Sequence, residues 1–271
     1  MKRKLMTVTI IASMIAASLT GCGSTGNTAS GTATTEAAVT TETGASDTSS
    51  ETAANDLNIM IETPVESLDP QIGQDGTSFE VIADFTDGLM QMDAEGAPIP
   101  AIAESYELSE DGLTYTFHLR NDAKWSNGVE VTAADFVFGW QRAVDPKNAC
   151  EYSYMMSDIG QVKNAAEIIA GEKDKSELGV TALDDTTLQV ELNVPVSYFL
   201  SLMYFPTFYP VNEEFYNTCA DTFASSPETT LANGAFMLDS YEPAATTIHL
   251  SKNPYYYDAD KIALSGLHYQ V

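Results

Sequence analysis

The sequence predicts an exported protein whose folded part has a mixed α/β architecture. An apolar segment near the N-terminus ends at a cysteine, a long stretch rich in Ser, Thr and Ala follows it, and strand-like and helix-like patterns alternate from Leu57 onward. The chain has 271 residues, of which 44% are hydrophobic, and this is enough for one or two packed domains. The sequence contains no internal repeat.

Residues 1–21 have the features of an export signal. A Lys-Arg-Lys triplet follows Met1, and the apolar run at residues 5–19 is short and interrupted by Ser and Thr, which disfavours a membrane span. The run closes on the letters LTGC, which resemble the lipobox of bacterial lipoproteins. This resemblance implies that Cys22 becomes the lipidated N-terminus of the mature protein. The alternative is a chance cysteine behind an ordinary signal.

Residues 22–56 are the predicted tether. Apart from Cys22 they are almost entirely Ser, Thr, Gly, Ala and scattered acids, without apolar periodicity. Such a composition cannot offset the entropy of ordering the chain. We therefore expect a flexible spacer that holds the folded part away from a membrane. A low-complexity stretch without a role would have the same composition.

The first elements after the tether are a strand and a helix. Apolar residues alternate with polar or flexible ones at residues 57–61, as in a strand, and the SLDP letters at residues 67–70 then predict a turn. Thr77 and Glu80, three residues apart, form a capping box that predicts the start of a helix. The apolar face of this helix comprises Phe79, Ile82, Phe85 and Leu89, with Gly88 near its end.

A hairpin and a second helix follow. Residues 105–108 and 113–120 read as strands on either side of an Asp-Gly pair, which is a strong turn signal. Thr132 and Asp135 form a second capping box, and an Asp-Pro pair is expected to end the helix that it opens. The apolar face of that helix comprises Phe136, Trp140 and Ala143 or Val144. Later strands are predicted at residues 187–192, 235–241 and 246–250.

Charge and motif content argue against nucleic-acid binding and against catalysis. The formal charge is −27, which repels phosphate backbones. No zinc-protease, nucleophile-elbow, dinucleotide-binding or Walker motif occurs, and Cys150 and Cys219 lack CxxC spacing, although they could pair outside the cell. His118 and His249 are expected on strand surfaces, and His268 lies near the last residue. We therefore expect no catalytic residue, no metal site and no cofactor.

Five segments carry a resemblance to a known family. The longest is SEDGLTYTFHLRNDAKWSNGVEVTAADFVFGWQRAVDP at residues 109–146. ESLDPQ and DFTDGLMQMDAEGAPIPAIAESY precede it, and NGAFMLDSY and LSKNPYYYDAD follow it. Together they resemble the extracellular solute-binding proteins of family 5, the receptors of oligopeptide and dipeptide ABC importers. The resemblance covers nearly all of residues 57–271 and is strongest to the oligopeptide-binding branch.

The resemblance implies a periplasmic-binding-protein-like fold of type II, a clamshell of two α/β lobes joined by a hinge. Residues 57–86 and 210–271 would form the sheet domain of the first lobe, and residues 87–209 a subdomain inserted in it. In the family the chain then crosses to a second lobe of comparable size, and this sequence stops near that crossing. We therefore expect the second lobe to be absent, and the chain to be a truncated gene, a gene fragment or one part of a split coding sequence.

The resemblance also assigns ligand-binding residues. Gln74, Asp75 and Gly76 follow the SLDP-like turn, at the place where the family's chain runs along the bound peptide and pairs with its backbone as a strand would. Tyr152 follows the Asp-Pro pair, at the position of an aromatic residue that lines the family's site. The family has an acid-Gly-apolar pattern where this chain has Gln-Asp-Gly. An ordinary surface loop and a core tyrosine are the alternative interpretation.

The implied function is that of a non-enzymatic, lipid-anchored receptor that captures extracellular oligopeptides and delivers them to an ABC permease and ATPase complex. It would lie outside the cytoplasm on the outer face of the cell membrane, which is the periplasmic side in a cell with an outer membrane. Two alternatives remain. One is a receptor for another ligand, such as a dipeptide, a nickel complex, a sugar or a pheromone, and the other is a surface lipoprotein remnant without a transport role.

Overall fold

The computed structural model describes residues 55–242, 244 and 246–271. Cys22, the predicted export signal (1–21) and nearly all of the predicted tether (22–56) lie outside the described residues. The described part contains three β-sheets and five α-helices, joined by turns, short 3-10 segments and one π-helical segment at Met155–Ile159. None of these helices combines the length and the apolar character that a membrane span needs.

The first sheet unites the two ends of the described part. Its strands, in spatial order, are β1 (Asp56–Met60), β10 (Gly266–Gln270), β9 (Thr247–Lys252) and β8 (Phe236–Ser240). β1 runs parallel to β10, and the β10–β9 and β9–β8 pairs are antiparallel. The strands predicted at residues 57–61, 235–241 and 246–250 are thus confirmed, with small shifts at their ends.

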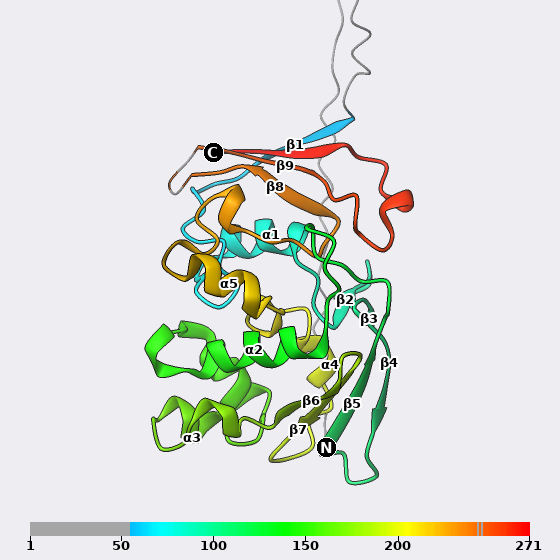
Figure 1. Ribbon diagram of the computed structural model, residues 1–271, viewed down its shortest axis with the longest axis vertical. Helices are drawn as coiled ribbons and strands as arrows, with labels where there is room; N and C mark the ends of the chain where they lie inside the picture. Colours follow the sequence, from blue (N-terminus) through cyan, green and yellow to red (C-terminus); the bar gives the residue numbers. More distant parts are fainter. Residues whose placement is uncertain (1–54, 243, 245) are drawn as a thin grey trace, which may run out of the picture. The chain divides into compact units, whose positions relative to one another are not determined.

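Helix α1 (Gly76–Phe85) covers one face of this first sheet (Figure 1). Its buried face packs against the inward-facing side chains of the sheet and forms one apolar core with them. This core includes Val81, Ile82, Phe85, Ile248, Leu250, Leu267 and Tyr269. Side chains alternate between the two faces of a strand, so His249 and His268 lie on the opposite face of the sheet.

The predicted start of α1 is wrong by two residues. Asp75, rather than Thr77, caps the helix, because its carboxylate accepts a hydrogen bond from the Ser78 amide at 2.8 Å. A short acidic side chain one residue before the helix satisfies a donor that the first turn leaves unpaired. The helix also ends at Phe85, before the predicted Leu89.

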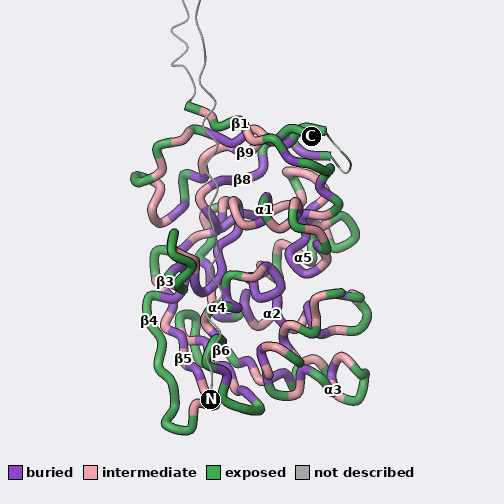
Figure 2. Tube along the Cα trace, turned by 180° about the vertical axis from the view of Figure 1, so that it is seen from behind, coloured by how far each residue is buried: buried purple, intermediate pink, exposed green. Residues whose placement is uncertain are grey.

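The second sheet is antiparallel and has the order β4 (Ala103–Leu108), β5 (Thr114–Leu119), β7 (Thr187–Glu191) and β6 (Val180–Asp184). The predicted β4–β5 hairpin and the β7 strand are confirmed. Asp111 accepts a hydrogen bond from the Leu113 amide at 3.1 Å, and Gly112 takes the left-handed conformation, with φ of +72°, that the turn requires. β4 is the exposed edge of this sheet (Figure 2). A third sheet consists of β2 (Met90–Met92) and β3 (Pro98–Pro100).

Helix α2 (Ala133–Val144) packs on the second sheet, mainly against β6. Its predicted capping box is confirmed, since the Asp135 carboxylate accepts a hydrogen bond from the Thr132 amide at 2.8 Å. The indole of Trp140 is fully buried and donates to the Phe208 carbonyl oxygen at 2.8 Å. The helix ends ahead of a proline, as predicted. The remaining helices are α3 (Ala165–Ile169), α4 (Phe199–Leu202) and α5 (Glu213–Cys219).

The buried apolar residues form two clusters. One surrounds the first sheet and α1, and the other surrounds the second sheet and α2. Tyr209, at the end of the predicted insertion (87–209), packs in the first cluster, and Leu231, within the predicted sheet domain (57–86 and 210–271), packs in the second. The division into these two domains stays a prediction.

A buried ion pair joins these two clusters. Arg142 of α2 lies 2.7 Å and 3.2 Å from the two carboxylate oxygens of Asp69, and the two side chains are 5% and 10% exposed. Gln71 accepts a further hydrogen bond from the guanidinium, and the ring of Tyr216 lies 4.4 Å from it. Asp69 follows Leu68 of the first cluster, so the pair fixes the SLDP turn against α2.

Candidate ligand-binding groove

The structure brings the four predicted ligand-binding residues together. Gln74, Asp75 and Gly76 lie at the start of α1, and Tyr152 reaches them from a distant part of the sequence. The Tyr152 hydroxyl donates a hydrogen bond to the Gln74 carbonyl oxygen at 3.3 Å. Their part in ligand binding stays a prediction.

Asp75 and the first two residues of α1, Gly76 and Thr77, differ in what they can offer a ligand. The Asp75 carboxylate caps α1 by accepting hydrogen bonds from the Ser78 amide and hydroxyl. Within the described residues, the amides of Gly76 and Thr77 donate no hydrogen bond, as is usual for the first turn of a helix. A Cβ atom at Gly76 would meet nothing within 4 Å. The first turn of α1 therefore has two backbone donors without a partner among the described residues, with open space around the first.

An aromatic wall stands next to these donors. The rings of Phe79, Tyr152 and Phe205 lie within 5.1–5.3 Å of one another in edge-on and tilted arrangements. The sequence predicted Phe79 only as a core residue and gave no sign of Phe205. The only sequence signal that Phe79 belongs to the site was its spacing of three residues from Gly76, which places the two on one face of a helix.

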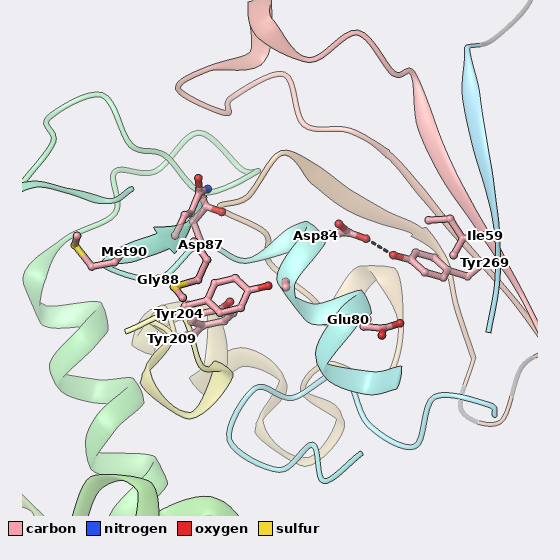
Figure 3. A pocket seen from close by; sticks show the side chains of 12 residues that line it. Ile59, Glu80, Asp84, Asp87, Gly88, Met90, Tyr204, Tyr209 and Tyr269 are labelled. Atoms are coloured by element: carbon pink, nitrogen blue, oxygen red, sulfur yellow. Dashed lines mark hydrogen bonds between the residues drawn. The ribbon is translucent and has the colours of Figure 1, made fainter. Parts of the chain in front are cut away.

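Two hollows extend from this wall along α1. A small one of about 150 Å³ borders Gly76, Phe79 and Phe205, and a larger one of about 410 Å³ borders Asp84 and Tyr269. Both are also lined by Glu80, Ala83, Tyr204 and Tyr209, so the two hollows adjoin along α1 and are together called the groove. Figure 3 shows Glu80 and Asp84 on α1 at the larger hollow, with Asp84 pointing toward Tyr269.

Acidic groups line the larger hollow. Burial raises the pKa of Asp84 to about 6, although the Tyr269 hydroxyl donates a hydrogen bond to it and opposes the shift. Burial likewise raises the pKa of Asp87 to about 6, against the opposing hydrogen bond from the Tyr257 hydroxyl at 2.9 Å. The groove thus presents carboxyl groups without a basic side chain among its lining residues, and it favours cationic groups.

The raised pKa of Asp87 predicts a pH dependence of stability. The folded-state pKa lies above the ordinary 3.8, so the folded protein holds a proton that the unfolded chain has released. The free energy of unfolding should therefore rise as the pH falls from 7 to 5, and Asp87 contributes on the order of 1 kcal/mol to this rise. Asp87→Asn should lose that contribution, as measured by urea unfolding at both pH values.

A matched control is Asp111→Asn, which removes an exposed carboxylate whose pKa is lowered by its hydrogen bond from Ser109. This control should keep the rise in stability between pH 7 and pH 5. The attribution to Asp87 is wrong if Asp87→Asn and the wild type gain equally on acidification.

The other residues considered in the sequence lie apart from the groove. His118 is a half-exposed residue of β5 whose ring nitrogen lies 3.6 Å from a Glu107 carboxylate oxygen. Cys150 and Cys219 are free thiols, so they do not form the disulfide that the sequence left open. Burial raises the pKa of Cys150 to about 11, which makes its thiol unreactive at neutral pH.

Comparisons with known proteins give one consistent family. A family model described as bacterial extracellular solute-binding proteins, family 5 Middle, matches residues 97–271. The oligopeptide-binding protein OppA of Bacillus subtilis is 37% identical over 78% of this chain and 38% of its own length. The probable deoxycholate-binding periplasmic protein YgiS of Escherichia coli is 41% identical over 75% of this chain and 37% of its own.

Solved structures agree with these relatives. The structure of Listeria monocytogenes OppA bound to peptide matches with a TM-score of 0.77 and 39% identity, covering 81% of this chain and 43% of that one. Haemophilus influenzae OppA in complex with RPPGFSPFR matches with a TM-score of 0.77 and 35% identity, covering 81% and 42%. The chain thus spans less than half the length of each of these proteins.

Proposed function

The chain belongs to family 5 of the bacterial extracellular solute-binding proteins, and on this premise we propose that it takes part in capturing extracellular oligopeptides for an ABC importer. The predicted mixed α/β fold of the periplasmic-binding-protein type is confirmed by the structural matches. The relatives are binding proteins and not enzymes, which supports a binding role without catalysis.

The observation that carries the proposal is the set of unpaired backbone donors beside an aromatic wall. The Gly76 and Thr77 amides can donate to carbonyl or carboxylate oxygens of an extended peptide, whatever its side chains. The rings of Tyr152 and Phe205, inclined by 50° to each other, offer an aromatic surface next to them. Backbone donors give affinity that tolerates many sequences, and such tolerance suits a receptor for mixed peptides.

Charge adds a second argument for a peptide ligand. Glu80 lies on both hollows and Asp84 on the larger, so the groove attracts an N-terminal amine or a basic side chain. Among the relatives, one is named for deoxycholate, an anion, and the acidic groove argues against such a ligand here. We propose that this groove is one wall of the site and that a second lobe of the family type supplies the opposite wall.

Two substitutions at residue 76 test the role of its amide. Proline suits the first position of a helix, and Asp75 has the extended backbone, with φ of −119° and ψ of 156°, that a following proline prefers. Gly76→Pro should therefore keep α1 and remove only the amide donor. Gly76→Ala keeps the donor and fills open space. We expect Gly76→Pro to weaken binding of a fluorescently labelled oligopeptide pool about 3- to 10-fold, and Gly76→Ala to leave it unchanged.

The aromatic wall is tested by fluorescence anisotropy with the same labelled oligopeptide pool. Tyr152→Ala should weaken peptide binding about 10-fold, because it removes stacking area and the hydrogen bond that positions the Gln74 carbonyl. Tyr255→Ala removes a tyrosine that is 45% exposed and lines neither hollow, and should have no effect. Equal affinity in Tyr152→Ala and Tyr255→Ala, or displacement of the peptides by deoxycholate, would contradict the proposed site.

Membrane attachment through Cys22 is part of the proposal. The LTGC letters behind the basic start and apolar run support it, and the relatives named as periplasmic place the family outside the cytoplasm. Cys22→Ala should leave the membrane fraction or accumulate as an unprocessed precursor, while Cys219→Ala should behave as the wild type. Immunoblotting of cell fractions measures both effects. If Cys22→Ala is processed and partitions to the membrane as the wild type does, Cys22 is not the anchor. Delivery of the peptide to a membrane permease with its ATPase completes the proposed role.

A further inference from the structure

Two histidines and an aspartate meet on the face of the first sheet that α1 does not cover. His249 on β9 and His268 on β10 stand directly opposite each other, and their rings stack with centroids 4.0 Å apart and planes 13° apart. Asp56 on β1 lies 3.0 Å from His268 Nε2 through its Oδ2 atom. One ligand atom from each of the three residues can be chosen so that all lie within 4.8 Å of one another.

Gly266 keeps the space between these groups open. A Cβ atom at this position would lie 3.1 Å from His249 Nε2 and 3.3 Å from Asp56 Oδ1. It would also lie 2.7 Å from the Leu250 carbonyl oxygen, so no other residue fits here without a shift. His249 Nε2 and Asp56 Oδ1 thus border a small gap, which stays open because Gly266 has no side chain.

A fourth residue orients one of the histidines. Asp239 Oδ2 lies 2.8 Å from His249 Nδ1, which directs Nε2 of that ring toward the gap over Gly266. A carboxylate that accepts the N–H of a metal-binding histidine is the usual partner behind such a ligand. A hollow of about 480 Å³ borders His249 and His268, so water can reach the site.

We propose that Asp56, His249 and His268 bind a divalent transition-metal ion, with Zn²⁺ as the best match. Two imidazoles and one carboxylate, with water in the fourth position, are typical of tetrahedral zinc, whereas Mg²⁺ and Ca²⁺ prefer oxygen ligands alone. Small rotations of the stacked rings would bring the nitrogens to about 2.0–2.1 Å from the ion. The net charge of −27 also attracts cations to the protein.

The site would act as a clip between distant parts of the chain. Asp56 belongs to the first described strand, and His249 and His268 belong to the last two. Metal binding to the folded state stabilises it relative to the unfolded chain. The ion would therefore hold β1 against β10, where the sheet joins the residue range predicted as the tether. Sequence spacing does not reveal this site, because only the strand register brings the three residues together.

The test is a calorimetric titration of the purified 271-residue chain with ZnCl₂ in chelator-free buffer, with MgCl₂ in parallel. We expect one zinc ion per chain, no binding of magnesium, and a higher melting temperature with zinc. His249→Ala with His268→Ala should weaken zinc binding at least about 100-fold and abolish the thermal shift. His118→Ala removes the remaining histidine of the chain and should bind zinc as the wild type does.

Two milder variants keep the proposal testable if the double variant folds poorly. Asp239→Asn should weaken zinc binding about 10- to 100-fold, because it removes the partner that orients His249. Asp56→Asn should weaken it at least about 10-fold while retaining the size of the side chain. If both variants bind zinc as the wild type does, or if the double histidine variant does, the zinc lies elsewhere, for example on cysteine thiols, and the proposal is wrong.

Discussion

Replacing Arg142 with alanine is expected to lower the free energy of unfolding by about 3 to 5 kcal/mol. The guanidinium is buried and is paired with Asp69 at 2.7 Å, and Gln71 also accepts a hydrogen bond from it. Removing it leaves a carboxylate and an amide oxygen inside the protein without their donor. It also opens the contact between the SLDP turn and α2, and with it the junction of the two apolar clusters.

Urea unfolding followed by circular dichroism measures this effect. Lys261→Ala is the matched control, because Lys261 pairs with Asp258 in a similar way but has a side chain that is 75% exposed. Exposed pairs contribute about 1 kcal/mol or less. Asp69→Asn should fall between the two, since it keeps one acceptor for the guanidinium. A loss in Arg142→Ala no larger than that of Lys261→Ala would show that the buried pair does not join the clusters.

The second large expected effect is a difference in peptide affinity between a protein with one wall of the site and a protein with both walls. In a clamshell the ligand is buried between the lobes, where exclusion of water strengthens each polar contact. In the proposed site the groove along α1 is one wall, and a second lobe of the family type would supply the other. We therefore expect the 271-residue chain to bind oligopeptides about 30- to 5,000-fold more weakly than a two-lobed form, which corresponds to about 2 to 5 kcal/mol.

A two-lobed form can be made as a chimera. The part of the Bacillus subtilis relative that lies outside its match to this chain would be joined after Val271. The two proteins are 37% identical over the matched part. Calorimetry with the same oligopeptide pool then compares the chimera with the 271-residue chain. Low-micromolar binding by the 271-residue chain as a monodisperse monomer would contradict the need for two walls.

Much of the fold could be predicted from short sequence patterns, because hairpin turns and helix caps depend on residues that are close together in the sequence. The Asp-Gly pair fixed the β4–β5 hairpin, and the Thr132 capping box fixed the start of α2. The same reasoning failed at α1, where two residues could cap and the chain uses Asp75 and Ser78 instead of Thr77 and Glu80. Competition between neighbouring polar side chains is decided by the path of the preceding turn, which the sequence pattern does not contain.

The candidate site shows a different limit. The resemblance to a family placed Gln74 and Tyr152 in one site, and the structure brings them within a hydrogen bond of each other. Phe205 was missed because its approach to Phe79 depends on how the two clusters pack. The group of Asp56, His249 and His268 was missed for a related reason, since strand register, rather than sequence spacing, determines which side chains stand opposite each other.

The most direct test of the account is an amide NMR titration of the isotope-labelled 271-residue chain with an oligopeptide pool, because NMR locates even weak binding. The account predicts saturable shifts at the amides of Gly76 and Thr77 and around Tyr152, with none on the far face of the first sheet near His249. Gly76→Pro should reduce these shifts. Saturable shifts confined to another surface, or none along α1 at millimolar peptide, would contradict the claim that this groove is one wall of a peptide-binding site.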